Sequence, residues 1–220
     1  MIGKILISGG TGYLGRVLTR KLIARGHSVL VLARKGSESK VTAPAQIFIG
    51  DALQGNSFVK SLEPGMTLVH LTGTPHPAPW KEREFRAIDL VSLRESAAAA
   101  QAAGVGHFVY VSVAQPAPVM RAYLQVRSEC EAILANTNLP RTILRPWYVL
   151  GPGHRWPEVL RPFYSLLEAI PATRDGARRL GLVTLEEMTS ALVWAVEHPV
   201  AGAQTLDVVQ IREKARSIGD

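Results

Sequence analysis

Three polar side chains in the middle of the chain could act together in a proton transfer. Tyr123 and Arg127 are four residues apart in a segment with helical spacing, so their polar ends can converge on one ligand. Ser112 ends the preceding apolar segment, near enough for its hydroxyl to join them. A tyrosine that donates a proton to a carbonyl needs a neighbouring cation to lower its pKa from about 10. We therefore predict that Ser112 holds a carbonyl oxygen, Tyr123 gives the proton and Arg127 orients a cofactor ribose.

A glycine-rich turn near the start of the chain could bind a diphosphate. Its glycines are three residues apart, between the apolar run at residues 4–8 and the amphipathic run at residues 16–25. Such a turn allows φ > 0, lets a pyrophosphate approach the backbone, and presents the free N–H groups of the following helix. A second apolar run at residues 28–33 follows at the distance of a βαβ unit. The predicted binding residues are Gly9, Gly10, Thr11, Gly12, Tyr13, Leu14 and Gly15, with an ordinary glycine-rich turn as the alternative.

The residues after the second apolar run bear on which dinucleotide would bind. Enzymes that prefer NAD usually carry an acidic residue about twenty residues past the glycines, where it binds the ribose 2′-hydroxyl. This chain has Arg34 and Lys35 there instead. Their charges repel no 2′-phosphate and can pair with one. We therefore expect NADP(H) to be preferred over NAD(H), and a solvated basic loop end is the alternative.

Apolar and amphipathic segments alternate along the chain. This order is typical of a doubly wound parallel α/β sheet, in which ligands bind at the carboxyl ends of the strands. The predicted strands lie near residues 3–8, 28–33, 46–50, 67–71, 107–112 and 141–145. The predicted helices lie near residues 13–25, 55–62, 81–103 and 119–136. We expect a single NAD(P)-binding Rossmann domain over residues 1–220, with residues 151–182 as a short substrate lobe.

Two further strand ends carry residues that could border a nucleotide. Asp51 follows the third predicted strand, where its carboxylate can accept a hydrogen bond from an adenine amino group or can cap the short helix that follows. Gly73 follows the fourth strand and would let the backbone approach the adenosine. His70 lies inside that strand, so we interpret it as a buried histidine with hydrogen-bond partners rather than as a ligand or base.

Composition limits the class of protein. With 47% apolar and 20% charged residues, the 220-residue chain can bury a sizeable core. The net charge of +7 favours anionic partners, but the basic residues form no run, so a phosphate-bearing cofactor fits better than nucleic acid. The single cysteine, Cys130, has the position of a core residue, excludes a cysteine metal cluster and suits a reducing cytoplasm. No apolar run reaches the ~18 residues of a membrane span, so a cytoplasmic protein is expected.

The chain resembles the short-chain dehydrogenase/reductase family over nearly its whole length. The resemblance rests on the glycine turn, Arg34, Gly50-Asp51, His70-Leu71-Thr72-Gly73, Tyr110-Val111-Ser112 and Tyr123-x-x-x-Arg127. The form Thr11-Gly12-Tyr13-Leu14-Gly15 and the segment at residues 144–151 look like the atypical or extended branch. That branch includes NAD(P)H-binding reductases, the nitrogen metabolite repression regulators and a nucleotide-binding accessory subunit of respiratory complex I.

The resemblance implies a role for each matching position. The glycine turn would bind the pyrophosphate, and Ser112 and Tyr123 match the catalytic pair, although they are closer in sequence than is usual for the family. The family motif is Tyr-x-x-x-Lys, so Arg127 is a departure: it can hydrogen-bond ribose hydroxyls but cannot relay a proton, because its pKa stays above ~12. The remaining implied contacts are Asp51 and Ala52 at adenine, Leu71, Thr72 and Gly73 at the adenosine ribose, and Pro146, Trp147 and Tyr148 along nicotinamide.

The second half should complete the substrate side. A helix is predicted at residues 158–170, in the region that forms the lobe over nicotinamide in extended members of the family. His154, Arg155 and Trp156 follow a glycine-proline turn and are candidates for substrate contact, with a structural loop as the alternative. A group of charged residues further on fits a solvated, salt-bridged surface better than a site for an acidic substrate. These residues are Arg174, Asp175, Arg178 and Arg179.

The last forty residues predict a helix and a strand. Thr184 and Glu187 have capping-box spacing for a helix through His198, which Pro199 closes. A final strand is predicted at residues 204–208, and the polar tail from Arg212 is expected to fray.

Two functions of different classes fit these residues. The first is an NADP(H)-dependent oxidoreductase that moves hydride between nicotinamide C4 and a small carbonyl, enone or quinone. The alternative is a regulator or assembly factor that binds NAD(P) without turnover, which Arg127 in place of lysine favours. The short second lobe argues against a third function, that of a sugar-nucleotide epimerase. The long helices predicted at residues 81–103 and 119–136 could also form a homodimer interface.

Overall fold

The computed structural model describes residues 3–117, 119–151 and 181–219. Seven parallel strands form one sheet in the order β3-β2-β1-β4-β5-β6-β9. The strand order reverses between β1 and β4, which is the point where open α/β sheets bind ligands. This confirms the predicted doubly wound sheet. The strands are β1 (Lys4–Ser8), β2 (Ser28–Ala33), β3 (Gln46–Ile49), β4 (Thr67–His70), β5 (His107–Val111), β6 (Arg141–Leu144) and β9 (Ala203–Leu206).

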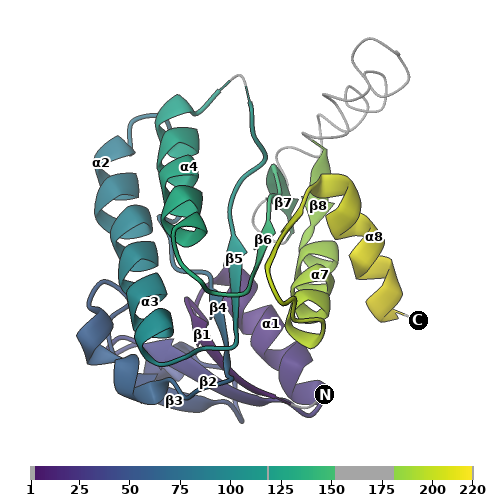
Figure 1. Cartoon of the computed structure of the whole chain (residues 1–220). Helices are drawn as coiled ribbons and strands as arrows, with labels where there is room; N and C mark the ends of the chain where they lie inside the picture. Colours follow the sequence, from purple (N-terminus) through teal and green to yellow (C-terminus); the bar gives the residue numbers. More distant parts are fainter. Residues whose placement is uncertain (1–2, 118, 152–180, 220) are drawn as a thin grey trace.

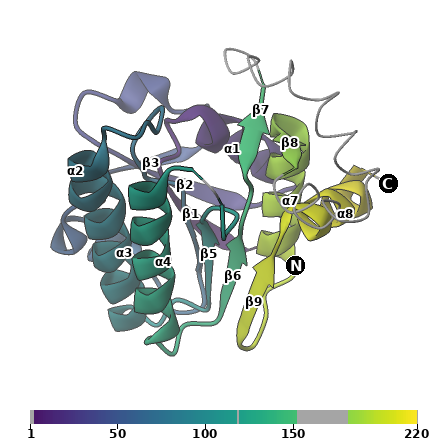
Figure 2. The ribbon, with the colours of Figure 1, turned by 90° about the horizontal axis from the view of Figure 1, so that it is seen from above.

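Helices cover both faces of this sheet (Figures 1 and 2). One face carries α3 (Val91–Ala102) and α4 (Arg121–Ala135), with α2 (Glu82–Glu84) and the π-helical turn η4 (Phe85–Leu90) leading into α3. The other face carries α1 (Tyr13–Ala24) and α7 (Leu185–Glu197), and α8 (Val208–Gly219) packs on α7. The result is a three-layer arrangement.

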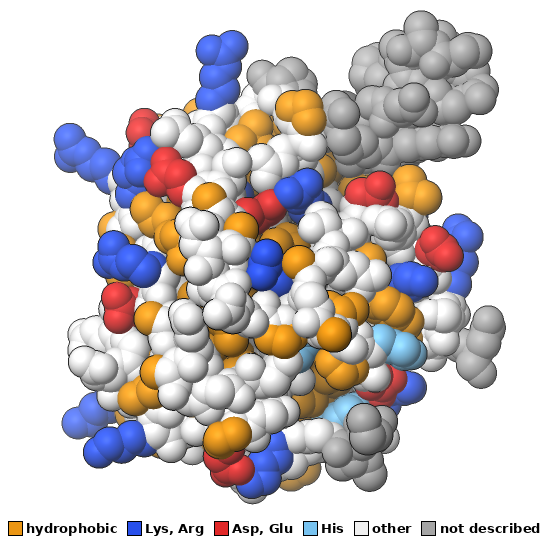
Figure 3. All heavy atoms as spheres, in the orientation of Figure 1, with side chains coloured by type: hydrophobic (Ala, Val, Ile, Leu, Met, Phe, Trp, Pro, Cys, Tyr) orange, Lys and Arg blue, Asp and Glu red, His pale blue; other side chains and the backbone are white. Residues whose placement is uncertain are grey.

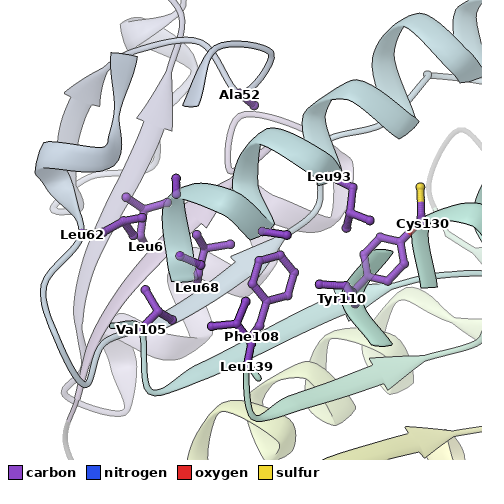
Figure 4. Packing of buried hydrophobic residues seen from close by; sticks show 14 of the residues in the cluster. Leu6, Ala52, Leu62, Leu68, Leu93, Val105, Phe108, Tyr110, Cys130 and Leu139 are labelled. Carbon is purple, nitrogen blue, oxygen red and sulfur yellow. The ribbon is translucent and has the colours of Figure 1, made fainter. Parts of the chain in front are cut away.

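The two hydrophobic cores follow from the alternation of side chains along each strand. In β1, Leu6 enters the core on the α3 and α4 side, whereas Ile5 and Ile7 enter the core on the α1 and α7 side. Phe108 and Tyr110 of β5 belong to the first of these cores, which also contains the buried Cys130 (Figure 4). The interpretation of Cys130 as a core residue is thereby confirmed.

A second, two-stranded parallel sheet lies next to the α1 and α7 layer. It consists of β7 (Tyr148–Leu150) and β8 (Leu182–Thr184), with Tyr148 opposite Leu182 and Leu150 opposite Thr184. Thr184 then caps α7: its side chain accepts from the Glu187 amide at 3.1 Å, and the Glu187 carboxylate accepts from the Thr184 amide at 2.7 Å. The predicted capping box is confirmed.

Two predicted elements differ from the structure, and one turn was not predicted. Residues 55–62 form two short 3-10 turns, η2 (Gly55–Ser57) and η3 (Val59–Ser61), because Gly, Asn and Ser have low propensity for the helix interior. A third 3-10 turn, η1 (Glu38–Lys40), was not predicted. The tail beyond Arg212 does not fray but belongs to α8, since Val208, Ile211 and Ala215 share one buried face of that helix.

Candidate functional site

The glycine turn lies at the switch point and leaves no room for side chains. Gly9 has φ +76°, and a Cβ there would lie 2.7 Å from the carbonyl carbon of Leu71, the residue after β4. A Cβ on Gly15 would lie 2.5 Å from the Gly10 Cα. Both distances are shorter than any side chain tolerates, so glycine is required for the turn to cross the ends of β1 and β4 and for α1 to pack against it.

The first turn of α1 presents unshielded amide groups at this edge. Gly12 precedes the helix and has no side chain that could cap it. No acidic residue lies in the first turn. A helix start of this kind has free N–H donors and a positive dipole end, both of which favour phosphate. The absence of Cβ atoms and of competing acceptors makes the turn fit a dinucleotide diphosphate.

The residues predicted at the adenosine end lie along the same edge. Arg34 and Lys35 follow β2, and their exposed side chains make no hydrogen bond or ion pair with any described residue. The Asp51 carboxylate accepts a 3.0 Å hydrogen bond from the Leu53 amide, within the turn after β3. Ala52 is buried beside it.

Gly73 lies directly above a buried ion pair. A Cβ on Gly73 would be 2.9 Å from Asp89 Oδ1 and 3.0 Å from Arg127 Nη2. These two atoms are themselves 2.7 Å apart, and the side chains of Asp89 and Arg127 are 0% and 9% exposed. The amide and hydroxyl of Thr74 both donate to Asp89 Oδ2, at 2.9 and 2.6 Å. The loop after β4 is therefore tied to α4 through Asp89.

Arg127 makes further contacts at the end of β5. Its Nη1 donates to the Tyr110 hydroxyl at 2.9 Å and to the Val111 carbonyl oxygen at 3.0 Å. Its Nε is buried without a hydrogen-bond partner among the described residues. Most of the guanidinium is thus engaged inside the protein, and Nε is the donor left for another acceptor.

Tyr123 lies against Arg127, as the i, i+4 spacing predicted. The Arg127 Cζ is 4.9 Å from the centre of the Tyr123 ring, and the Phe85 ring centre is 4.9 Å from that ring on another side. Burial raises the pKa of Tyr123 above 10.0, and the positive charge of Arg127 lowers it only in part. The phenol therefore remains protonated at neutral pH, but the lowered pKa expected from its cationic neighbour is not found, because burial has the larger effect.

Ser112 is engaged with a carboxylate that sequence analysis did not single out. Its hydroxyl donates to Glu131 Oε1 at 2.5 Å, and the same oxygen accepts from Gln115 at 3.2 Å and from Arg145 Nε at 3.0 Å. Arg145 also pairs with Glu131 Oε2. In this position the Ser112 oxygen can only accept a hydrogen bond, from a substrate hydroxyl; it can donate to a substrate carbonyl only after turning away from Glu131.

His70 is a core residue, as interpreted. Its Nδ1 lies 3.0 Å from the Ser8 hydroxyl and its Nε2 lies 3.4 Å from the Ser92 hydroxyl. Burial and the nearby charge of Arg127 lower the pKa of His70 from 6.5 to about 3, so the ring is neutral. Both ring nitrogens have partners, which confirms a structural histidine.

The residues predicted to lie along nicotinamide are in the segment between β6 and β7. The Ala114 amide donates to the Pro146 carbonyl oxygen at 2.9 Å, which joins this segment to the loop after β5. Tyr148 begins β7 and lies near Tyr13 of the glycine turn, whose pKa is raised by burial and then by Tyr148. A Cβ on Gly151 would collide with the Tyr13 hydroxyl, so Gly151 lets the turn and β7 meet. Trp147, which lies between Pro146 and Tyr148 in the sequence, is partly exposed.

Several predicted residues lie outside the described ranges. These are most of the lobe at residues 151–182, the helix at residues 158–170, and His154, Arg155, Trp156, Arg174, Asp175, Arg178 and Arg179.

Sequence reasoning missed two acidic residues that organise the site. Asp89 is a lone acid between apolar residues in Ala87-Ile88-Asp89-Leu90-Val91, and a lone acid on an apolar helix face indicates a buried partner. Glu131 lies four residues after Arg127 on the same predicted helix, but nothing in its spacing pointed to Arg145. Asp89 was therefore recognisable in the sequence, whereas Glu131 was not.

The described ranges contain neither a candidate metal site nor a helix that could span a membrane. Over the described ranges, no three His, Cys, Asp or Glu side chains are grouped so that they could hold a metal ion. Within the same ranges, every helix is too short or too polar to cross a membrane. On the face drawn in Figure 3, basic and acidic side chains are interspersed with hydrophobic ones.

This fold and turn define a class of protein: a Rossmann protein with a glycine turn for a dinucleotide. Comparison with known proteins gives the family. Residues 9–155 match the family described as NAD(P)H-binding, and the chain belongs to that family. The resemblance to atypical short-chain dehydrogenase/reductases is confirmed, and the ligand is a nicotinamide dinucleotide.

Individual relatives are distant. The 2-alkyl-3-oxoalkanoate reductase of Stenotrophomonas maltophilia is 32% identical, over 68% of this chain and 52% of its own length. The photosystem II assembly factor Ycf39 of a Synechocystis species is 29% identical, over 64% of this chain and 44% of its own length. The chain thus spans about half the length of these two relatives. The structure of MoeE5 in complex with UDP-glucuronic acid and NAD has a TM-score of 0.70 at 22% identity, over 94% of this chain and 76% of that one, and supports the fold.

Proposed function

We propose that this protein is an NADP(H)-dependent oxidoreductase that transfers hydride between nicotinamide C4 and a small carbonyl, enone or quinone. The observation that carries the proposal is the pairing of a side-chain-free diphosphate turn with a protonated tyrosine held against a fixed cation. When bound, the dinucleotide supplies the hydride. The rest of the chemistry is a proton transfer, for which Tyr123 is the donor.

The protein's own residues have three proposed tasks. The glycine turn and the start of α1 bind the diphosphate and fix the dinucleotide along the carboxyl edge. Arg127 holds the Tyr123 ring by its contact with the ring face. Tyr123 gives its hydroxyl proton to the substrate oxygen as hydride arrives.

The preference for NADP(H) is supported by Arg34 and Lys35. Both are exposed after β2, and a 2′-phosphate there would gain two cations that have no acidic partner in the described parts of the chain. A cytoplasmic location, and a homodimer formed through α3 and α4, complete the proposal; sedimentation at several concentrations tests the second.

A competing function is that of a regulator or assembly factor which binds NAD(P) without turnover. It is favoured by the position of Arg127, because the residue that replaces the family lysine is paired with Asp89 inside the protein. The 29% identical photosystem II assembly factor supports the same alternative.

One series of measurements separates the two functions. NADPH and NADH are titrated against the protein, and oxidation of the tighter one is followed by stopped flow with aldehydes, enones and quinones. The oxidoreductase proposal expects turnover that Tyr123→Phe reduces about 100-fold or more, while dinucleotide affinity is retained. Tight binding with no turnover across the panel supports the regulator instead, and unchanged turnover in Tyr123→Phe rejects Tyr123 as the acid.

A further inference from the structure

A small cavity opens beside Tyr123. Its volume is about 220 Å³, and it lies between the loop after β4 and the first turn of α4. Figure 1 shows that α2 and the start of α4 are at the same end of the molecule. The described residues that line the cavity are Pro79, Phe85, Met120, Arg121, Ala122 and Tyr123.

The walls of this cavity are mostly apolar. Phe85 is fully buried behind it, and Met120 and Tyr123 pack against the same core. Two large apolar side chains next in sequence to lining residues, Trp80 and Val119, are 82% and 53% exposed. Large apolar side chains that remain exposed beside a cavity indicate an apolar ligand.

Arg121 is the cation in this lining, and it differs from its basic neighbours. Lys81 pairs with Glu84 at 3.4 Å, and Arg86 pairs with Glu129 at 3.1 Å. The Arg121 side chain is exposed and makes no hydrogen bond or ion pair with a described residue. A guanidinium available at the edge of an apolar cavity favours a ligand with a carboxylate, which it can bind with two parallel hydrogen bonds.

The volume limits the size of the apolar part. A buried cavity of about 150 Å³ holds one benzene molecule. A cavity of about 220 Å³ therefore accommodates one ring and a short substituent. A nucleotide sugar is too large for it.

We propose that the substrate is a ring-sized apolar carbonyl compound that carries a carboxylate, with its ring in this cavity and its carboxylate on Arg121. This inference rests on the proposed oxidoreductase function and names its substrate class. In the reaction, hydride from nicotinamide C4 forms a C–H bond at the carbonyl carbon, and the C=O π electrons take the Tyr123 proton to give an alcohol. The reduced dinucleotide becomes oxidised, and Tyr123 regains its proton from solvent.

The test compares two probes of equal size, 4-formylbenzoate and its uncharged analogue 4-formylbenzamide. Their binding to the full chain with saturating NADP⁺ is measured by calorimetry, so that no reduction occurs. The wild-type protein should bind the carboxylate about fivefold more tightly than the amide, the effect of one partly exposed ion pair. Arg121→Gln should remove this preference. Arg20→Gln, which alters an exposed arginine on α1, should keep it.

Equal affinity for the two probes in the wild type, or a carboxylate preference that survives in Arg121→Gln, overturns the inference. Oxidation of NADPH by 4-formylbenzoate is then followed separately. Arg121-dependent binding without oxidation supports the ligand class and rejects the oxidoreductase proposal. Tyr123-dependent oxidation by a quinone, with no carboxylate preference in binding, does the reverse.

Discussion

The two ends of the candidate site are built in opposite ways. At the diphosphate end, Gly9 and Gly15 have no side chains, and the start of α1 has no capping side chain, so the backbone itself faces the ligand. At the reactive end, two polar side chains are held by carboxylates: Arg127 by Asp89, and Ser112 by Glu131. The first end is defined by atoms that are missing, the second by side chains that are already paired.

This difference shows where each end is sensitive to change. Adding one methyl group to the glycine turn should block binding, because there is no space for it. At the reactive end the sensitive feature is charge balance, because removing one partner leaves the other buried and uncompensated. Four predictions test this contrast, from the largest effect to the smallest.

Breaking the buried ion pair should have the largest effect. Asp89→Ala should lower the free energy of unfolding by about 3–5 kcal/mol, because it leaves the Arg127 guanidinium buried without its partner. Urea denaturation at pH 7 measures this. The control is Glu63→Ala, which breaks the Lys4–Glu63 pair, whose side chains are 60% and 57% exposed. That variant should lose less than about 1 kcal/mol. Similar losses in both variants would contradict the assigned role of Asp89.

A methyl group in the glycine turn should lower the free energy of unfolding less than Asp89→Ala does, but it should weaken dinucleotide binding more. Gly9→Ala places a side chain at φ +76° and 2.7 Å from the Leu71 backbone. Gly36 has φ +84° with nothing within 4 Å, so Gly36→Ala carries the backbone cost alone. We expect a loss of about 1–2 kcal/mol for Gly36→Ala, and about 1–2 kcal/mol more for Gly9→Ala.

Dinucleotide titration separates these two glycine variants further. Gly9→Ala should bind NADPH at least about tenfold more weakly, since the turn must shift away from the diphosphate, whereas Gly36→Ala should bind it normally. Normal NADPH affinity in a folded Gly9→Ala protein would be incompatible with a diphosphate site at this turn.

The third prediction concerns His70, which lies between the two ends. In the unfolded chain its pKa is 6.5, whereas burial and Arg127 lower it to about 3 in the folded protein. As pH falls from 6.5 towards 3, the unfolded chain takes up a proton that the folded protein refuses, so stability decreases. The expected slope is about 1.4 kcal/mol per pH unit.

The measurement is urea unfolding at pH 6.5, 5.5 and 4.5 for the wild type and His70→Gln. The variant should lose part of the slope. His107→Gln should do the same over pH 6.5 to about 4, because burial lowers the pKa of His107 to about 4. A slope that neither variant changes would mean that other groups control the acid sensitivity.

The smallest effect is expected at the adenosine end. Replacing Arg34 and Lys35 together by alanine should weaken NADPH binding about tenfold and leave NADH binding nearly unchanged, because only NADPH carries the 2′-phosphate. Lys60→Ala, at an exposed lysine of η3, is the matched control and should change neither affinity. Equal weakening of both dinucleotides would show that the two cations do not read the 2′-phosphate.

Local chemistry explains what the sequence could predict. Short-range patterns predict the glycine turn and the strands at residues 28–33 and 107–111, and the structure has these elements within a residue or two of the predicted positions. The capping box of α7 is likewise a four-residue signal. His70 could be interpreted correctly because a histidine inside an apolar strand needs buried partners.

The parts that sequence could not predict depend on contacts between distant segments. The pairing of Asp89 with Arg127 joins residues 38 positions apart, and Glu131 meets Arg145 across two elements. The tail beyond Arg212 is polar by composition, but Ala215 continues the buried face of Val208 and Ile211, and α8 packs on α7, which local polarity cannot reveal. The pairing of β7 with β8 was missed for the same reason.

That pairing of β7 with β8 has a consequence for how such chains can diversify. Because Leu150 and Thr184 are partners in one ladder, the chain departs from the Rossmann core and re-enters it through adjacent strands. Each doubling of the stretch between two such fixed points costs only about 0.6 kcal/mol of closure entropy. A chain in which paired strands flank the connecting stretch can therefore exchange or lengthen that stretch without altering the sheet that holds the nucleotide.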